Sequence, residues 1–94
     1  MRYPLRPIYG YNLPVGASSV NAARVIPRGI LALRFAATAD CWVTIGQELG
    51  ADTSRSFLVF AGVPELIGVT EGETISVVRS GDLEGSLNVS EMSH

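Results

Sequence analysis

Short stretches in which apolar and polar residues alternate recur along this 94-residue chain, separated by glycines, prolines and acidic turn residues. Alternation with a period of two places every second side chain on one face of a β-strand. The stretches lie roughly 8–12 residues apart, a spacing typical of antiparallel sandwiches and barrels. The sequence therefore predicts an all-β fold, a small antiparallel β-sandwich of jelly-roll-like or barrel-like form. We expect its strands at residues 29–37, 41–46, 55–60, 65–69, 74–79 and 86–91, with residues 18–26 as an ambiguous segment that ends at Pro27.

The alternation also predicts which side chains form the core. We expect buried faces made of Leu31, Leu33, Phe35, Cys41, Val43, Ile45, Ile75, Val77, Leu87 and Val89. The nearly continuous apolar run at 55–60 is expected for a strand covered on both faces. A helix is the alternative for residues 29–40, but the flanking proline and glycine favour a strand. Residues expected opposite the core, which a small monomer would struggle to cover, are Ile30, Val59, Ile67 and Val78.

Prolines at positions 4, 7 and 14 exclude a helix at the N-terminus, because proline fixes φ and removes a backbone donor. They also interrupt the apolar stretch that a secretory signal would need. We expect residues 1–17 to form an extended arm and residues 18–94 to form the sandwich domain. Tyrosine and arginine are common interface anchors. The arm is expected to dock on another chain through Arg2, Tyr3, Arg6, Tyr9 and Tyr11; the alternatives are that it covers its own sheet as a first edge strand, or is disordered.

Charge is distributed unevenly along the chain. All seven basic residues are arginines; residues 1–39 hold five of them and no acid, a net +5, whereas residues 40–94 hold two and all nine acids, a net −7. A guanidinium is weakly hydrated and forms a planar fork, which suits partly buried bidentate pairing with carboxylates. We interpret the basic half as pairing with acidic protein surface, of this chain or of a neighbour; arginine-biased composition is the alternative. The overall charge of −2 gives no reason to expect nucleic acid as a partner.

The sequence offers little for catalysis. Its one cysteine and one histidine, Cys41 and the terminal His94, provide no nucleophile–base constellation and no cysteine-based zinc cluster. We expect Cys41 to be a buried small apolar residue, and the carboxylate pairs Glu71/Glu73 and Asp82/Glu84 to be solvated turn charges, not calcium ligands. Trp42 is expected in core or interface packing, with a sugar-stacking platform as the alternative. We therefore expect no catalytic, cofactor-binding or metal-binding residue, and no apolar run approaches the roughly 20 residues that span a bilayer.

Four pieces of the chain, in the same order and covering about residues 30–91, resemble small β-sandwich virion structural proteins of tailed bacteriophages. They are a strand with a small-residue approach, a proline turn, an acidic glycine turn and a Gly-x-Leu-x-Val final strand: Ala37–Gly46, Ala61–Glu65, Glu71–Val77 and Gly85–Ser90. The resemblance implies a non-enzymatic capsid component, a decoration or cement protein that assembles as a homotrimer. The implied partner is the major capsid protein, and the implied location is the capsid surface after synthesis in the host cytoplasm.

Three functions are expected to behave differently. A structural virion component should be oligomeric and should lose attachment, but not its fold, when residues 1–16 are deleted. A tail or head-fibre module that recognises a carbohydrate or receptor should lose its ligand on Trp42→Ala. A hydrolase should lose activity when one carboxylate is changed.

Overall fold

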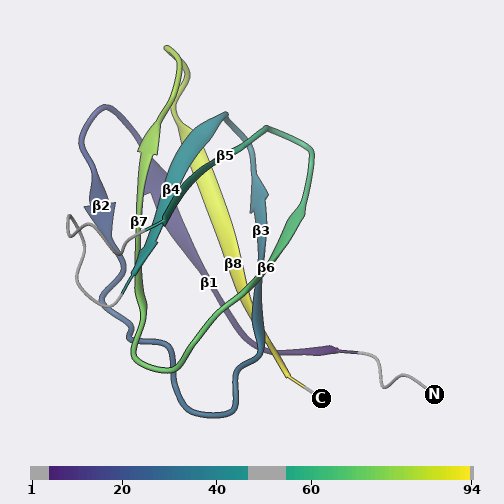
Figure 1. Ribbon diagram of the computed structural model, residues 1–94. Helices are drawn as coiled ribbons and strands as arrows, with labels where there is room; N and C mark the ends of the chain where they lie inside the picture. Colours follow the sequence, from purple (N-terminus) through teal and green to yellow (C-terminus); the bar gives the residue numbers. More distant parts are fainter. Residues whose placement is uncertain (1–4, 47–54, 94) are drawn as a thin grey trace.

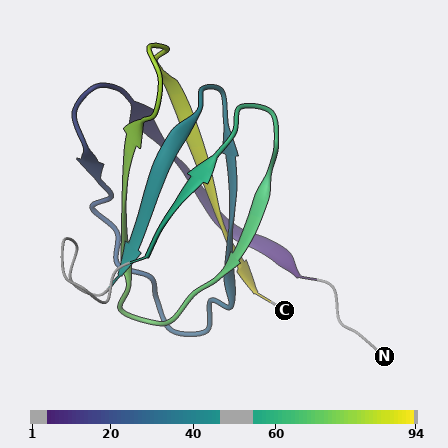
Figure 2. The ribbon, with the colours of Figure 1, turned by 45° about the horizontal axis from the view of Figure 1, so that its top comes forward.

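The computed structural model describes residues 5–46 and 55–93 of the chain. It confirms the all-β prediction: two four-stranded antiparallel sheets pack face to face (Figures 1 and 2). The strand order is β1-β8-β3-β6 in the first sheet and β2-β7-β4-β5 in the second. Consecutive strands largely alternate between the sheets in this order, as in an eight-stranded jelly roll. The strands are β1 (Arg6–Val15), β2 (Val20–Asn21), β3 (Ala32–Ala37), β4 (Cys41–Gly46), β5 (Arg55–Val59), β6 (Glu65–Gly68), β7 (Thr74–Arg79) and β8 (Gly85–Ser93). Across the described part of the chain there is no helix long and apolar enough to cross a membrane.

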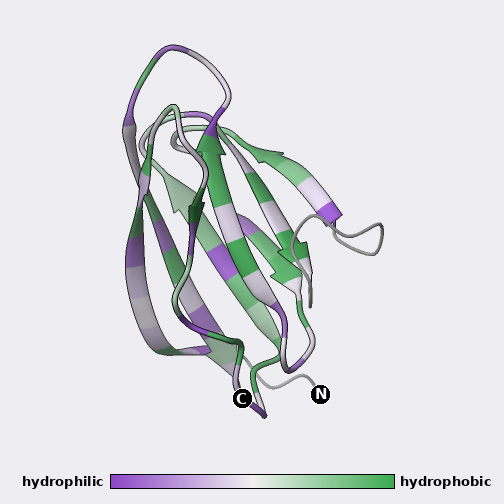
Figure 3. Cartoon of the chain, turned by 90° about the vertical axis from the view of Figure 1, so that its left-hand side faces the viewer, coloured by the Kyte–Doolittle hydropathy of each residue, from purple (hydrophilic) through white to green (hydrophobic). Residues whose placement is uncertain are grey.

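The core lies between the two sheets, and the hydropathy colouring alternates along the strands as this requires (Figure 3). Phe35 of the first sheet has no exposed surface and meets Phe57 of the second sheet edge-on, with ring centroids 5.6 Å apart. The predicted inward faces are confirmed except at one position. Leu31, which directly precedes β3, is 45% exposed. Fully enclosed side chains include Leu33, Cys41, Val43, Ile45, Ile75, Leu87 and Val89.

Three of the four residues expected opposite the core are directed toward it instead. Val59 has no exposed surface, because it pairs with the inward-facing Cys41. Ile67 pairs with the buried Leu33 and packs against the core. Ile30 is buried where the segment before β3 folds over the end of the sandwich. Only Val78, which pairs with Trp42, lies on an outer face.

Residues 6–15 of the expected arm form β1, which runs along β8 at the edge of the first sheet. This arrangement corresponds to the alternative in which the segment covers its own sheet. Leu13 and Val15 enter the core from β1, and the pairing with β8 extends from Arg6 to Val15 with one irregularity between Pro7 and Tyr9. Prolines are compatible with this position because an edge strand leaves one row of its backbone donors unpaired within the sheet.

Candidate docking surfaces

A buried carboxylate lies at the end of the sandwich where β1 begins and β8 ends. Glu91 of β8 has no exposed surface and stands in register with Tyr9 on one side and Leu33 on the other. Arg24, in the segment between β2 and β3, donates from Nε to Glu91 Oε2 (2.5 Å) and from Nη2 to Oε1 (2.8 Å). A bidentate pair of this kind satisfies both carboxylate oxygens, which a buried acid requires.

Two tyrosines complete this group, which we call the Arg24 cluster (Tyr9, Tyr11, Arg24 and Glu91). The guanidinium carbon of Arg24 lies 4.2 Å from the centroid of the Tyr9 ring, a cation–π contact, and the Tyr9 and Tyr11 rings are 5.9 Å apart. Burial, followed by the negative charge of Glu91, raises the pKa of Tyr11 to about 12. The hydrogen bonds to Glu91 raise the pKa of Arg24, so its guanidinium stays charged at this place.

The expected contact residues lie partly in this cluster. Tyr9 is 49% exposed and covers Arg24, whereas Tyr11 is half-buried and packs against the core. Arg6 is exposed and pairs with Ser93. Arg2 and Tyr3 lie outside the described residues. Beside Tyr9, Ile8 is 58% exposed at the irregularity of β1, so this end of the edge strand presents one aliphatic and one aromatic side chain to solvent.

A second apolar surface lies on the outer face of the second sheet. Trp42 of β4 pairs with Leu58 of β5 and with Val78 of β7, so the three side chains form one row across neighbouring strands. Trp42 is 45% exposed, and its inward neighbours Cys41 and Val43 have no exposed surface. We call the outer face of this sheet the Trp42 face.

Polar side chains make up the rest of the Trp42 face. Ser76, Thr44 and Ser56 form the next row; the Thr44 and Ser56 hydroxyl oxygens are 2.9 Å apart, and Ser76 is only 9% exposed. The exposed Asp40 lies at the end of the same face, because the hydrogen bond from the Ser80 backbone N–H to its carbonyl continues the pairing of β4 with β7. Arg55, which pairs with the buried Ile45, belongs to the opposite side of the sheet.

The expectation that Glu73 is a solvated turn charge is wrong. Glu73 is only 9% exposed and accepts hydrogen bonds from the Thr70 backbone N–H (2.7 Å) and from Arg55 Nη2 (3.1 Å). The turn brings the Glu73 carboxylate, directly before β7, into an ion pair with Arg55 at the start of β5. Asp82 and Glu84 are exposed, as expected, and Glu84 lies 4.0 Å from Arg79. No group of three or more His, Cys, Asp or Glu side chains that could hold a metal ion occurs in residues 5–46 and 55–93.

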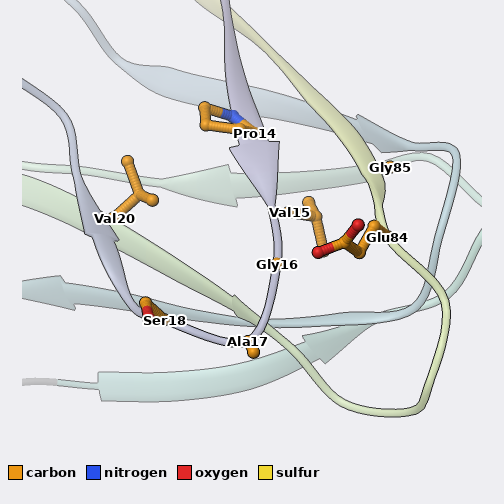
Figure 4. Close-up of a pocket in the computed structure, with 8 residues that line it drawn as sticks. All are labelled: Pro14, Val15, Gly16, Ala17, Ser18, Val20, Glu84 and Gly85. Carbon is orange, nitrogen blue, oxygen red and sulfur yellow. The ribbon is translucent and has the colours of Figure 1, made fainter.

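Shallow pockets flank the loop between β7 and β8. The larger, about 470 Å³, lies between this loop and the turn after β1, with Glu84 on one side and Pro14, Gly16 and Val20 on the other (Figure 4). Glu84 is the one ionisable side chain in its lining, and it is largely exposed. A specific small-molecule site places several polar groups around its ligand. The lining of this pocket does not offer such a set of polar groups. The start of β1 and the Trp42 face are therefore stronger candidates for a functional surface.

The alternation of β8 indicates that Glu91 is buried, but it does not identify the partner of its carboxylate. Glu91 follows Leu87 and Val89 at the inward positions of β8, so the same alternation that predicts their burial places its carboxylate inside. Its partner Arg24 is 67 residues away in sequence, in a segment with no clear pattern. The expectation that arginine pairs with carboxylates of the chain itself is confirmed at this site.

Comparisons of the chain with protein-family models, with curated proteins and with solved structures found no match.

Proposed function

We propose that this chain is a structural protein of a tailed-bacteriophage virion, an oligomeric decoration or cement protein that binds the head surface and bridges neighbouring capsid subunits. One observation carries the proposal: two separate surfaces expose aromatic and aliphatic side chains. The first is the start of β1, with Ile8 and Tyr9, and the second is the Trp42 face, where Trp42 is exposed beside the partly buried Leu58 and Val78. A bridging protein needs at least two such surfaces.

The two surfaces point to different neighbours because they lie on different sheets and toward opposite ends of the sandwich. Val78 and Trp42 lie near the loop from β7 to β8, whereas Tyr9 pairs with Glu91 near the end of β8. Contact through both would connect two other polypeptides through one rigid domain. On a particle, several copies act together, so that weak single contacts combine into firm attachment.

The sequence resemblance to phage virion proteins is the second support. The fold by itself does not decide the function, because jelly rolls serve in viral capsids and in lectins alike. The cross-strand neighbours of Trp42 are the apolar side chains of Leu58 and Val78, which suit contact with an apolar protein surface.

The proposal is tested by adding purified chain to phage heads that lack it and sedimenting the particles. We expect the chain to sediment with the heads and to raise the temperature at which they release DNA. Tyr9→Ala should weaken attachment, whereas Leu66→Ala, which alters an exposed side chain on the outer face of the first sheet, should not. A chain that stays in the supernatant contradicts the proposal, and a chain that binds only tails or cell-surface glycans favours the fibre-module alternative.

A further inference from the structure

β1 is held by the rest of the domain as a separate piece. It lies at the edge of the first sheet, where it pairs with β8 in a register that runs from Arg6 to Val15. Leu13 and Val15 enter the core from β1, and Tyr9 covers Arg24. These contacts are with residues that follow β1 in the sequence. An identical strand from another copy of the chain therefore finds the same contacts.

The segment that joins β1 to β2 has the features of a hinge. It consists of Gly16, Ala17, Ser18 and Ser19, of which the last three are exposed. The pocket of Figure 4 lies directly against this segment, so that it can straighten without displacing packed side chains. The hydrogen bond from the Arg79 backbone N–H to the Gly16 carbonyl (2.9 Å) holds it in its turned form. A short connection of this kind favours strand exchange between copies.

We infer that β1 exchanges between two copies of this chain, so that β1 of one copy pairs with β8 of the other. The structure itself identifies the strand that fits, because the edge of β8 and the core beneath it already accept this ten-residue segment. Exchange of an identical element between copies is a low-cost route to an oligomer. The inference goes beyond the proposed function, since it needs no phage head.

The energetics favour exchange at high concentration. The contacts between β1 and β8 are the same within one chain and between two, so the two forms differ in the hinge and in the cost of bringing copies together. Pro7 and Pro14 restrict φ, which keeps a released strand extended and lowers the entropy that it loses on pairing again. We therefore expect single chains at low concentration and exchanged chains at high concentration, as on a crowded particle surface.

Exchange also gives the N-terminal segment both of the roles that the sequence leaves open. β1 covers its own sheet in the single chain and a neighbour's sheet in the exchanged form. In both forms Leu13 and Val15 are buried, and the exposed start of β1 stays available for a further partner.

A pair of cysteines across β1 and β8 reports which chain supplies the strand. Asn12 and Asn88 stand opposite each other, and Asn88 Nδ2 donates to Asn12 Oδ1 (3.0 Å). Asn12→Cys with Asn88→Cys, in a Cys41→Ala chain, should form a disulfide between these strands. The variant is oxidised at about 1 μM and at about 1 mM, and its mass is measured after denaturation without reductant. We expect single chains at the low concentration and covalently linked dimers or larger rings at the high one. Single chains at both concentrations overturn the inference.

A matched pair tests for chance collisions between surface thiols. Thr44 of β4 and Ser56 of β5 are opposite each other, with hydroxyl oxygens 2.9 Å apart, and both strands stay in one chain when β1 exchanges. Thr44→Cys with Ser56→Cys should therefore give single chains at both concentrations. Linkage of this control to the same extent as the Asn12/Asn88 variant overturns the inference.

A mixture of the single variants Asn12→Cys and Asn88→Cys gives the answer if the double variant folds poorly. Exchange links unlike chains, because it places β1 of one against β8 of the other. Collision links like and unlike chains without preference. Random pairing in the mixture overturns the inference.

The length of the hinge provides a further test. About six glycine and serine residues inserted after Ala17 relieve the turn and should lower the linked fraction at least about 10-fold. The same insertion after Gly81, in the exposed loop between β7 and β8, should leave the fraction unchanged. Equal effects of the two insertions overturn the inference.

Failure of this inference is distinguishable from failure of the proposed function. A chain that attaches to phage heads, but whose engineered disulfide forms only within one chain, keeps the proposed function without exchange. A chain that exchanges β1 but does not bind heads keeps the exchange and loses the proposed function.

Discussion

Arg24 holds both carboxylate oxygens of Glu91, a residue that solvent does not reach, across 67 residues of sequence. The pair joins the segment between β2 and β3 to the end of β8, and Tyr9 of β1 covers it. It therefore fixes the end of the sandwich where the exposed part of β1 begins. An acid in this position is stable only with its partner, because an unpaired buried charge is costly.

Removal of Arg24 should therefore destabilise the fold. Arg24→Ala leaves Glu91 buried without its cation, and we expect the melting temperature to fall by roughly 5–10 °C. Thermal melts of the two chains, followed by circular dichroism, measure this. Arg34→Ala, an exposed arginine on the outer face of the first sheet, serves as the control and should behave like the original chain.

Alkaline pH should weaken the fold through Tyr11. The pKa of Tyr11 is raised from the ordinary value of 10.0 to about 12. Its phenol therefore loses its proton at a higher pH in the folded chain than in the unfolded chain. The stabilisation is fully present below pH 10 and is lost as the pH rises to about 12. We expect a loss of about 1 kcal/mol, reduced from the full shift because Tyr11 is only half-buried. Denaturant unfolding of Tyr11→Phe, which removes the ionisable group, should show a smaller decrease over the same range.

Deletion of residues 1–16 should disrupt the sandwich itself. It removes β1, the edge partner of β8, together with the buried Leu13 and Val15. The expectation that such a deletion abolishes attachment and spares the fold is therefore not supported by the strand pairing. Circular dichroism and amide exchange should show loss of cooperative structure, whereas a chain that begins at Arg6 should remain folded. A stable sandwich without residues 1–16 would show that β1 is dispensable.

Phe35 is expected to be the most sensitive core position. It has no exposed surface and contacts Phe57 of the opposite sheet, so Phe35→Ala should lower the free energy of unfolding by about 3–5 kcal/mol. A change at Leu66, which is 56% exposed, should stay within about 0.5 kcal/mol. Urea denaturation distinguishes the two. Equal effects would contradict the assignment of the core.

Cys41 should be unreactive while the chain is folded. Its side chain is buried in β4, and burial, together with the nearby charge of Asp40, raises the pKa of the thiol. Because the thiolate is the reactive form, a thiol reagent at neutral pH should modify Cys41 only after denaturation. Fast modification of the native protein would show that β4 opens readily.

Alternation predicted most strands because it is a local property: Cys41 to Gly46 and Thr74 to Arg79 have the predicted bounds. Pairing is not local. The sequence could not show that Val59 lies opposite Cys41, that residues 6–15 join β8, or that Arg24 reaches Glu91. For the candidate docking surfaces, residue type drew attention to Tyr9 and Trp42, but the exposure of their side chains depends on how the sheets are arranged.

Electron cryomicroscopy of intact particles that carry the chain tests the central claim most directly. We predict sandwich density at symmetry-related positions on the outside of the head, where one chain contacts two neighbouring capsid subunits. Density inside the shell, at the tail only, or in contact with a single capsid subunit would contradict the proposed function.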